Sequence, residues 1–392
     1  MNEATQKFIE EHREDDVNKL LLQGARYSQV DMPLAVRQIY GRQKVKQKIP
    51  SFYNCDDLLY PQKLSLEQSS SEITAKHKSN ICEGKLLIDL TGGFGVDSFF
   101  FSMKFDELCY VEQNEELCTL ARHNFPALGR NNLHIMNDTA EHFLLQPWQA
   151  DWIYLDPARR FRGGMKAVLL SDCQPDVTTL QDALFSHAKQ VMIKLSPMLD
   201  LTALLQSLKH IREVHIVAVD NECRELVVLL DTQNSNPPVI KTVNYIKNSS
   251  TEQFDFCPDD RDAENVQYTP ELKQYLYEPN AAIMKSGAFS LICDRFQVDK
   301  LHVNSHLYTS DQYIEHFPGR KFRVEKTSEF NKQTLRDLKK QLTKVNISVR
   351  NFPLSVSELR QRANLSEGGE IYLFATTMSD GKKVLINCSK LK

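Results

Sequence analysis

Between residues 85 and 230 the sequence alternates short apolar runs with stretches of helical pattern. Seven runs have the length and apolar character of buried strands: KLLIDL, ELCYVE, LHIMND, DWIYLD, QVMIKL, VHIVAV and ELVVLL. Helical spacing of apolar residues occurs between them, over 115–124, 139–145, 177–187 and 199–210. Parallel strands need a crossover connection, usually a helix, so this alternation predicts a doubly wound α/β domain with a mostly parallel sheet.

The last two predicted strands break the alternation. Only DNECR separates VHIVAV from ELVVLL, which is too short for a crossover helix. These strands should therefore form an antiparallel hairpin. About five parallel strands followed by a hairpin is not the ordinary NAD-binding arrangement.

The rest of the sequence predicts further regions around this sheet. Residues 1–80 show helical spacing of apolar residues, with the serines of 69–71 placed to cap one helix. After residue 231 the chain becomes rich in Asn, Ser, Pro and charge, which marks a domain boundary. We expect a helical domain (1–80), the α/β domain (81–232), a linker with a small, ferredoxin-like α/β region (233–318) and a small α+β domain (319–392).

The cysteine pattern and the hydropathy of the sequence restrict the cellular compartment of the protein and the kinds of structural cross-link it can contain. The nine cysteines are scattered singly, without a C-x-x-C pair, which argues against a structural zinc site and a disulfide scaffold. No apolar run approaches the roughly twenty residues of a membrane-spanning helix, and the polar, acidic N-terminus is no signal peptide. We expect a cytoplasmic protein with reduced thiols, no metal and no membrane span.

The segment LLIDLTGGFGVDSFFF is the strongest local signal for a ligand site. A strand ending in Asp89 leads through a turn with Gly92, Gly93 and Gly95 into a helix. Glycine lets a ligand approach the backbone closely, and a helix N-terminus offers free N–H groups. The pattern alone is weak evidence, because Ser98 replaces the third glycine of the dinucleotide motif.

Acids also stand at the ends of the next strands. Glu112 ends the second strand, where it can accept both hydroxyl protons of a ribose. Asp138 follows the third strand, where it can accept from an adenine amino group. Each acid alone could be a solvated strand end. Ligands bind at the carboxyl edge of a doubly wound sheet, however, so acids at consecutive strand ends indicate one site.

The stretch IYLDPARR brings Asp156 and Pro157 to the tip of the fourth strand, directly before an arginine-rich loop. Proline has no N–H, which leaves the Asp156 side chain and nearby carbonyls as acceptors for a substrate N–H or O–H. Arg159, Arg160 and Arg162 are suited to hold an anion such as a phosphate by forked hydrogen bonds. The alternative is a solvated strand–loop junction with a chance group of arginines.

The motifs DLTGGFGVD, VEQN, ND and LDPARR, with the closing hairpin, resemble class I S-adenosylmethionine-dependent methyltransferases over roughly residues 80–232. EQSSSEITAKHKS, YLYEPNAAIMKSGAF and the basic C-terminal region resemble, more narrowly, a bacterial methyltransferase family with a C-terminal THUMP-like domain. The resemblance implies a Rossmann-like, seven-stranded sheet with a terminal antiparallel hairpin, S-adenosylmethionine as cofactor, and a THUMP-like domain over 319–392.

The resemblance also implies roles for individual residues. Asp89 and the three glycines would hold the methionine part of the cofactor, Glu112 the ribose and Asp138 the adenine, while Asp156 would face the methyl acceptor. The full candidate sets are Asp156 and Pro157 for catalysis; Asp89, Thr91, Gly92, Gly93, Gly95, Asp97, Glu112, Gln113, Asp138 and Thr139 for cofactor binding; and Arg159, Arg160, Arg162 and Lys194 for substrate binding.

The residues around Pro157 restrict which methyl-transfer mechanisms the sequence supports. Ala158 and Arg159 stand where amino-group nucleic-acid methyltransferases usually carry an aromatic residue that stacks the target base, so N6-adenine chemistry is not supported. No cysteine adjoins Pro157 or the KLSP stretch to attack a pyrimidine ring. What remains is direct displacement by a nitrogen or oxygen lone pair, promoted mainly by positioning.

A local excess of positive charge in residues 319–362 points to a partner. Twelve cations stand against four acids there, although the whole chain has a net charge of −3. The cations are Arg320, Lys321, Arg323, Lys326, Lys332, Arg336, Lys339, Lys340, Lys344, Arg350, Arg360 and Arg362. Such a surplus suits a phosphate backbone, whereas an ordinary solvated face is the alternative.

A second basic stretch, VRQIYGRQKVKQKIP, lies near the N-terminus. Its cations are Arg37, Arg42, Lys44, Lys46 and Lys48. They could form a second edge of the same groove or an exposed helix face.

The sequence therefore predicts an S-adenosylmethionine-dependent methyltransferase that acts on structured RNA, tRNA or rRNA. The alternatives are a small-molecule or protein methyltransferase, a catalytically inactive RNA-binding protein, and a dinucleotide oxidoreductase. The terminal hairpin and Ser98 disfavour the oxidoreductase. Asp89, the glycine turn and Asp156 are intact, which disfavours loss of catalysis.

Overall fold

The computed structural model describes residues 1–159, 169–247, 250–261 and 266–391. The chain forms two compact units. The first comprises Met1–Val214 and Arg224–Pro237, and the second comprises His215–Cys223 and Pro238–Lys392. Among the described residues, no helix combines the length and apolar character needed to cross a membrane.

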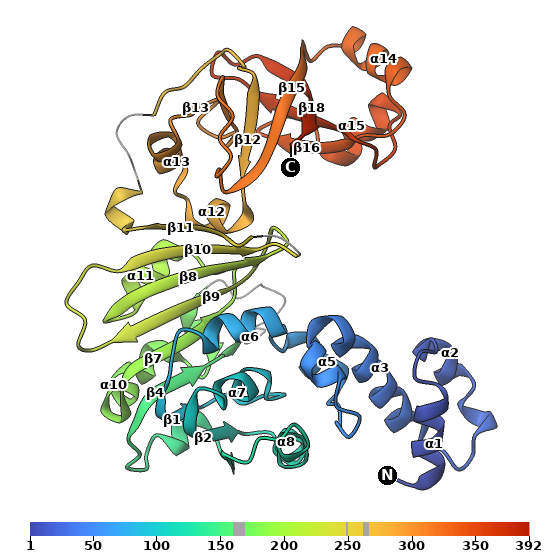
Figure 1. Ribbon diagram of the computed structural model, residues 1–392, viewed down its shortest axis with the longest axis vertical. Coiled ribbons are helices and arrows are strands. Elements are labelled where there is room, and N and C mark those ends of the chain that lie inside the picture. Colours follow the sequence, from blue (N-terminus) through green and yellow to red (C-terminus); the bar gives the residue numbers. More distant parts are fainter. Residues whose placement is uncertain (160–168, 248–249, 262–265, 392) are drawn as a thin grey trace. The chain divides into compact units, whose positions relative to one another are not determined.

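The N-terminal part of the first unit is helical (Figure 1). Its helices are α1 (Glu3–Glu11), α2 (Val17–Leu22), the short 3-10 helix η1 (Gly24–Arg26), α3 (Met32–Lys48), α4 (Pro50–Tyr53), α5 (Lys63–Gln68) and α6 (Glu72–Ser79). Phe8, Leu20 and Ile39 belong to a small apolar core of their own. Ser71 caps α6 as predicted, because its hydroxyl accepts a hydrogen bond from the Thr74 N–H at 3.3 Å.

A nine-stranded sheet has the order β11-β10-β8-β9-β7-β4-β1-β2-β3. Its strands are β1 (Gly84–Asp89), β2 (Phe105–Glu112), β3 (Leu133–Asn137), β4 (Ala150–Leu155), β7 (Ala188–Leu195), β8 (Ile211–Val219), β9 (Glu222–Asp231), β10 (Val239–Tyr245) and β11 (Glu252–Phe256). All seven predicted strands are present. The strands β10 and β11 extend the sheet with residues of the predicted linker.

The strand directions also agree with the prediction. The strands β1, β2, β3, β4 and β7 pair in parallel, whereas β9 runs antiparallel to β7. Asp220 and Asn221, between β8 and β9, have φ values of 50° and 62°, the left-handed conformation that favours a tight two-residue hairpin. The sheet therefore carries the terminal hairpin expected of class I methyltransferases.

Helices connect the parallel strands. They are α7 (Val96–Phe101), α8 (Glu115–Ala127), α9 (Ala140–Phe143), α10 (Val177–His187) and α11 (Leu201–Ser207). After β3 the chain returns to the other side of β1, so β1 lies between β2 and β4. This reversal creates a crevice at the carboxyl ends of β1 and β4, which is where open α/β sheets bind ligands.

The second unit contains a seven-stranded sheet of order β13-β14-β12-β15-β18-β17-β16. Its strands are β12 (Tyr275–Pro279), β13 (Asp299–Lys300), β14 (Tyr308–Ser310), β15 (Gly319–Glu329), β16 (Asn346–Arg350), β17 (Ile371–Thr377) and β18 (Lys383–Lys390). Its helices are η3 (Pro258–Asp260), α12 (Ala281–Ser286), α13 (Phe289–Phe296), α14 (Lys332–Gln341) and α15 (Val356–Ala363). Because β12 pairs with β15, residues on both sides of position 319 share one sheet and one core, with Leu276 and Phe322 in the same apolar cluster.

Candidate active site

A pocket of about 520 Å³ lies at the carboxyl edge of the parallel strands in the first unit. Every residue of the predicted cofactor set lines it, and so do Asp156, Pro157 and Lys194. The volume lies within the range of small-molecule sites. The fold therefore brings together side chains that the sequence places at the ends of separate strands.

Asp89, at the end of β1, anchors the glycine turn. Its Oδ1 accepts a hydrogen bond from the Thr91 N–H at 3.0 Å, and its Oδ2 accepts one from the Ser98 hydroxyl. Its side chain is only 1% exposed. Burial raises the pKa of Asp89 to about 7, although the hydrogen bonds from Ser98 and Thr91 act in the opposite direction. Ser98, which departs from the dinucleotide motif, thus helps to hold the strand-end carboxyl group.

The glycines are required by close packing and by backbone conformation. A β-carbon on Gly92 would lie 2.1 Å from the Tyr110 ring, so a larger residue cannot fit without displacing that ring. Gly95 has a φ of 82° and precedes the first residue of α7, a left-handed conformation that L-residues other than glycine rarely adopt. The turn can therefore pass close beneath a bound ligand.

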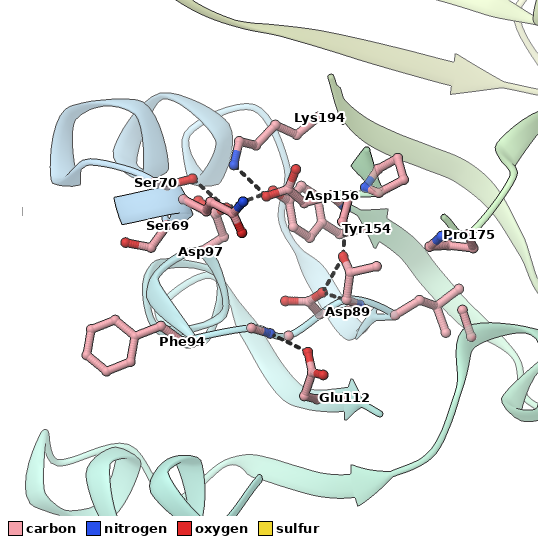
Figure 2. A pocket seen from close by; sticks show the side chains of 18 of the residues that line it. Ser69, Ser70, Asp89, Phe94, Asp97, Glu112, Tyr154, Asp156, Pro175 and Lys194 are labelled. Atoms are coloured by element: carbon pink, nitrogen blue, oxygen red, sulfur yellow. Dashed lines mark hydrogen bonds and ion pairs between the residues drawn. The ribbon is translucent and has the colours of Figure 1, made fainter. Parts of the chain in front are cut away.

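Glu112, at the end of β2, contacts the same turn. One carboxylate oxygen accepts from the Gly93 N–H at 2.9 Å and the other from the Asn114 N–H at 2.8 Å. Each oxygen has two lone pairs, so both can accept one further hydrogen bond. Figure 2 shows Glu112 on the wall of the pocket, apart from the group formed by Lys194, Asp156 and Asp97.

Asp138 follows β3 and is held by neighbouring residues. Its Oδ1 accepts from the Thr139 N–H at 2.8 Å, and its carboxylate lies 2.8 Å from His142 Nδ1. Thr139 caps α9 by accepting a hydrogen bond from the His142 N–H at 3.2 Å. Gln113, also predicted to bind the cofactor, lines the first unit's pocket as well.

Asp156 follows β4 at the switch point and forms an ion pair with Lys194 of β7. The Nζ of Lys194 lies 2.5 Å from Asp156 Oδ2, and the Asp156 N–H donates to Thr91 Oγ1 at 2.6 Å. Burial alone would lower the pKa of Lys194, but the carboxylates of Asp156, Asp97 and Glu225 raise it overall. Lys194 is therefore a stable cation, and its observed partner is the predicted catalytic acid.

Asp97, predicted to bind cofactor, belongs to a buried polar cluster beside the pocket. Its carboxylate accepts from the hydroxyls of Ser70 and Tyr154 at 2.7 Å each and lies 3.2 Å from Lys78 Nζ. Lys78 also pairs with Glu225 of β9 at 2.7 Å, and both side chains are almost completely buried. Burial alone would raise the pKa of Asp97, but Lys78, Lys194 and these hydrogen bonds lower it.

Sequence reasoning missed the contribution of the N-terminal helices to this pocket. Ser65 and Gln68 of α5 form part of its lining. Ser69 and Ser70, in the connection to α6, line it as well (Figure 2). The signal was present in the stretch EQSSSEITAKHKS, which resembles the methyltransferase family although it lies outside the sheet domain. Cys173, Gln174, Pro175 and Arg224 also line the pocket and were not predicted.

The predicted substrate arginines are only partly described. Arg160 and Arg162 lie outside the described residues. Arg159 belongs to β5 (Ala158–Arg159), whose backbone pairs with β6 (Cys173–Gln174). The 3-10 helix η2 (Leu170–Asp172) directly precedes β6 in the sequence. Among the described residues, no three His, Cys, Asp or Glu side chains gather as metal ligands would.

The strand order and the pocket at its carboxyl edge define the class I methyltransferase fold. The crystal structure of a "putative methyltransferase" from Porphyromonas gingivalis W83 is 35% identical with a TM-score of 0.88, and the match covers 99% of this chain and 98% of that chain. The chain belongs to the family of this Porphyromonas gingivalis protein. Residues 275–318 match a ferredoxin-like domain family and residues 319–390 a THUMP domain-like family, which confirms the resemblance seen in the sequence.

Weaker likenesses cover less than half of this chain. A "putative methyltransferase" from Streptococcus mutans in complex with S-adenosylhomocysteine is 15% identical with a TM-score of 0.30, covering 41% of this chain and 96% of that chain. TrmK of M. capricolum, also in complex with that product, is 9% identical with a TM-score of 0.33, covering 45% and 71%. Among curated proteins, none matches this chain.

Proposed function

We propose that the protein is an S-adenosylmethionine-dependent methyltransferase that acts on structured RNA, tRNA or rRNA. The observation that carries the proposal is the convergence of Asp89, Glu112, Asp138 and Asp156, from consecutive parallel strands, on one pocket. That pocket lies where open α/β sheets bind their ligands. Membership of a family whose solved member is named a methyltransferase supports the same activity here.

The described residues fit this cofactor. Glu112 keeps a free lone pair on each oxygen for the two ribose hydroxyls, and Asp138 is placed to accept from an amino group of the base. Asp89 and the glycine turn would lie against the methionine part, whose ammonium group favours an ionised carboxylate. Bound S-adenosylmethionine would supply a methyl group already activated on a sulfonium.

Asp156 is the residue proposed to face the methyl acceptor. Lys194 holds its Oδ2, and no other described residue donates a hydrogen bond to Oδ1. Oδ1 can therefore accept from an N–H or O–H of the acceptor, orient the attacking lone pair and take up the released proton. Pro157 has no N–H that would compete for this carboxylate.

One face of α14 in the second unit supports RNA as the acceptor. Lys332, Arg336, Lys339 and Lys340 recur at helical spacing and are all exposed. Among the described residues, no carboxylate forms an ion pair with any of them. Such a face is free to bind the phosphates of a nucleic acid.

Calorimetric titration with S-adenosylmethionine, S-adenosylhomocysteine and NAD tests the cofactor. We expect binding of the first two and none of NAD. Asp89→Asn and Glu112→Gln should each weaken binding at least about tenfold, because each removes a charged hydrogen-bond acceptor worth about 1.5–3 kcal/mol. Asp182→Asn is the matched control, since its side chain is 87% exposed and pairs with Lys209. NAD binding instead would favour the oxidoreductase.

Transfer of a labelled methyl group tests the acceptor. Total RNA from cells that lack the gene should become labelled by the wild-type protein and not by Asp156→Asn. Labelling of protein or small molecules alone would replace RNA with the alternative acceptor classes. Cofactor binding without transfer to any of these pools would instead support a protein that has lost catalysis.

A further inference from the structure

We infer that the pocket has a phosphate subsite for the RNA on its acceptor side, formed by Lys44 and Lys48 of α3 with Arg224 of β9. The inference rests on the proposed RNA acceptor and adds a binding surface in the first unit. The cations of the basic stretch near the N-terminus fall into two groups in the structure: those that form an ion pair with an acid and those that do not.

Three cations of that stretch are compensated by acids. Arg37 pairs with Glu116 at 2.6 Å, Arg42 with Asp56 at 2.6 Å, and Lys46 with Glu14 at 3.3 Å. These side chains stabilise contacts of α3 with its surroundings, so they are poor candidates for a ligand site.

Lys44 and Lys48 have no such partner. Lys44 is exposed, and within the described ranges no acid pairs with it. Lys48 Nζ donates to the backbone carbonyls of Leu66 and Glu67 at 2.8 Å each. Those carbonyls are neutral acceptors, and among the described residues no carboxylate forms an ion pair with Lys48, although the nearby Glu67 attracts its charge.

Lys48 belongs to a cluster of like charges. Burial, together with repulsion from Lys194, Lys44 and Arg224, lowers its pKa to about 8, whereas the Glu67 carboxylate acts in the opposite direction. Arg224 and Lys194 line the pocket, as do Ser65, Gln68 and Ser69 next to the carbonyls that Lys48 contacts. Lys194 lies beside Asp156 and away from Glu112 (Figure 2), so the cations that repel Lys48 include one on the acceptor side of the pocket.

The acids of this region are largely engaged elsewhere. Asp156 pairs with Lys194, while Glu225 and Asp97 share Lys78. Glu67 accepts from the Tyr40 hydroxyl at 2.8 Å. An anion bound between Lys44, Lys48 and Arg224 would relieve their mutual repulsion. A nucleic acid whose target nucleotide enters the pocket necessarily brings phosphates to its rim.

Fluorescence anisotropy with a labelled, unmodified tRNA transcript tests the subsite through the salt dependence of binding. Lys44→Gln with Arg224→Gln should weaken binding and reduce the slope of log affinity against log salt by about 1.4 to 1.8, the value for two lost phosphate contacts. Both side chains are exposed, so the variant should fold, which thermal unfolding checks. Lys46→Gln is the matched control on the same helix, because its charge is paired with Glu14.

The pH dependence gives a second readout for Lys48. Phosphate binds the protonated amine better, so wild-type affinity for the transcript should fall by up to about fourfold between pH 7 and pH 8.5, around the Lys48 pKa of about 8. Lys48→Arg keeps the charge at both pH values and should show a smaller fall.

Two outcomes would overturn the subsite, and they have different meanings. A wild-type protein that binds S-adenosylmethionine but neither the tRNA transcript nor rRNA, even at about 50 mM salt, would remove both the RNA acceptor and the subsite. Unchanged slopes in the double variant, with tRNA binding intact in the wild type, would remove only the subsite.

Discussion

A single buried acid couples the first strand of the sheet to the pocket. Asp89 is 1% exposed, and its burial raises its pKa to about 7. Hydrogen bonds from Ser98 and Thr91 hold the carboxyl group in place. A group that titrates near neutral pH at a ligand site makes the charge of that site depend on pH.

We therefore expect cofactor affinity to depend on pH. The ionised form of Asp89 attracts the cationic methionine part, and this form becomes dominant only above the pKa of about 7. Affinity for S-adenosylmethionine should rise by up to about eightfold between pH 6 and pH 7.5. Calorimetric titration across this range measures the change. Asp89→Asn should give weaker binding with a flatter profile, whereas a flat wild-type profile would exclude control by Asp89.

Among the elements, α6 is held to the sheet by a buried charge cluster as well as by apolar contacts. Lys78 reaches both Asp97 at the start of α7 and Glu225 in β9. Two carboxylates without their shared cation would be left in a poorly solvated place. The same cluster fixes Ser70, which lines the pocket, through its hydrogen bond to Asp97.

Lys78→Met should accordingly destabilise the protein by about 3–5 kcal/mol, the typical cost of breaking a buried pair by removing one partner. Lys209→Met, which breaks the exposed pair with Asp182, should cost about 1 kcal/mol or less. Urea unfolding of both variants gives the two free energies of unfolding. Equal losses would mean that the buried cluster contributes no more than a surface pair.

These elements also show what could be predicted from the sequence. Each strand is a short apolar run, and Asp89, Glu112 and Asp138 stand at or just past strand ends, so the sheet and much of the pocket lining followed from local pattern. The buried cluster did not, because Lys78 and Glu225 are 147 residues apart and a buried lysine looks like a surface lysine in a single sequence. For the same reason the pocket wall formed by α5 and its connection to α6 was missed.

For the whole molecule, the uneven distribution of charge matters more than the total. The chain has a net charge of −3, yet the exposed cations of α14 are concentrated on one face. Ligand steering and phosphate binding depend on such local fields, not on net charge.

Replacing Lys332, Arg336, Lys339 and Lys340 with Gln should therefore weaken tRNA binding and lower the salt slope by up to about 2.8 to 3.6 if all four contact phosphates. Electrophoretic mobility shifts at several salt concentrations measure this effect. The control variant replaces Lys7, Lys46, Lys63 and Lys209 with Gln and so has the same change in net charge. It should bind tRNA better than the α14 variant, because each of these lysines is already paired with an acid. An equal loss in both variants would indicate a response to total charge only.

The ferredoxin-like and THUMP-like segments share one sheet in the second unit, and this has a consequence for how the two segments are inherited. The ferredoxin-like segment supplies β12 and the THUMP-like segment supplies β15, and these two strands pair along five residues of each. A recombination breakpoint at residue 319 would leave an unpaired edge on each product, and unpaired edges promote aggregation. Selection should therefore keep the two segments together, so genomes should rarely encode this kind of THUMP-like segment without the ferredoxin-like segment before it.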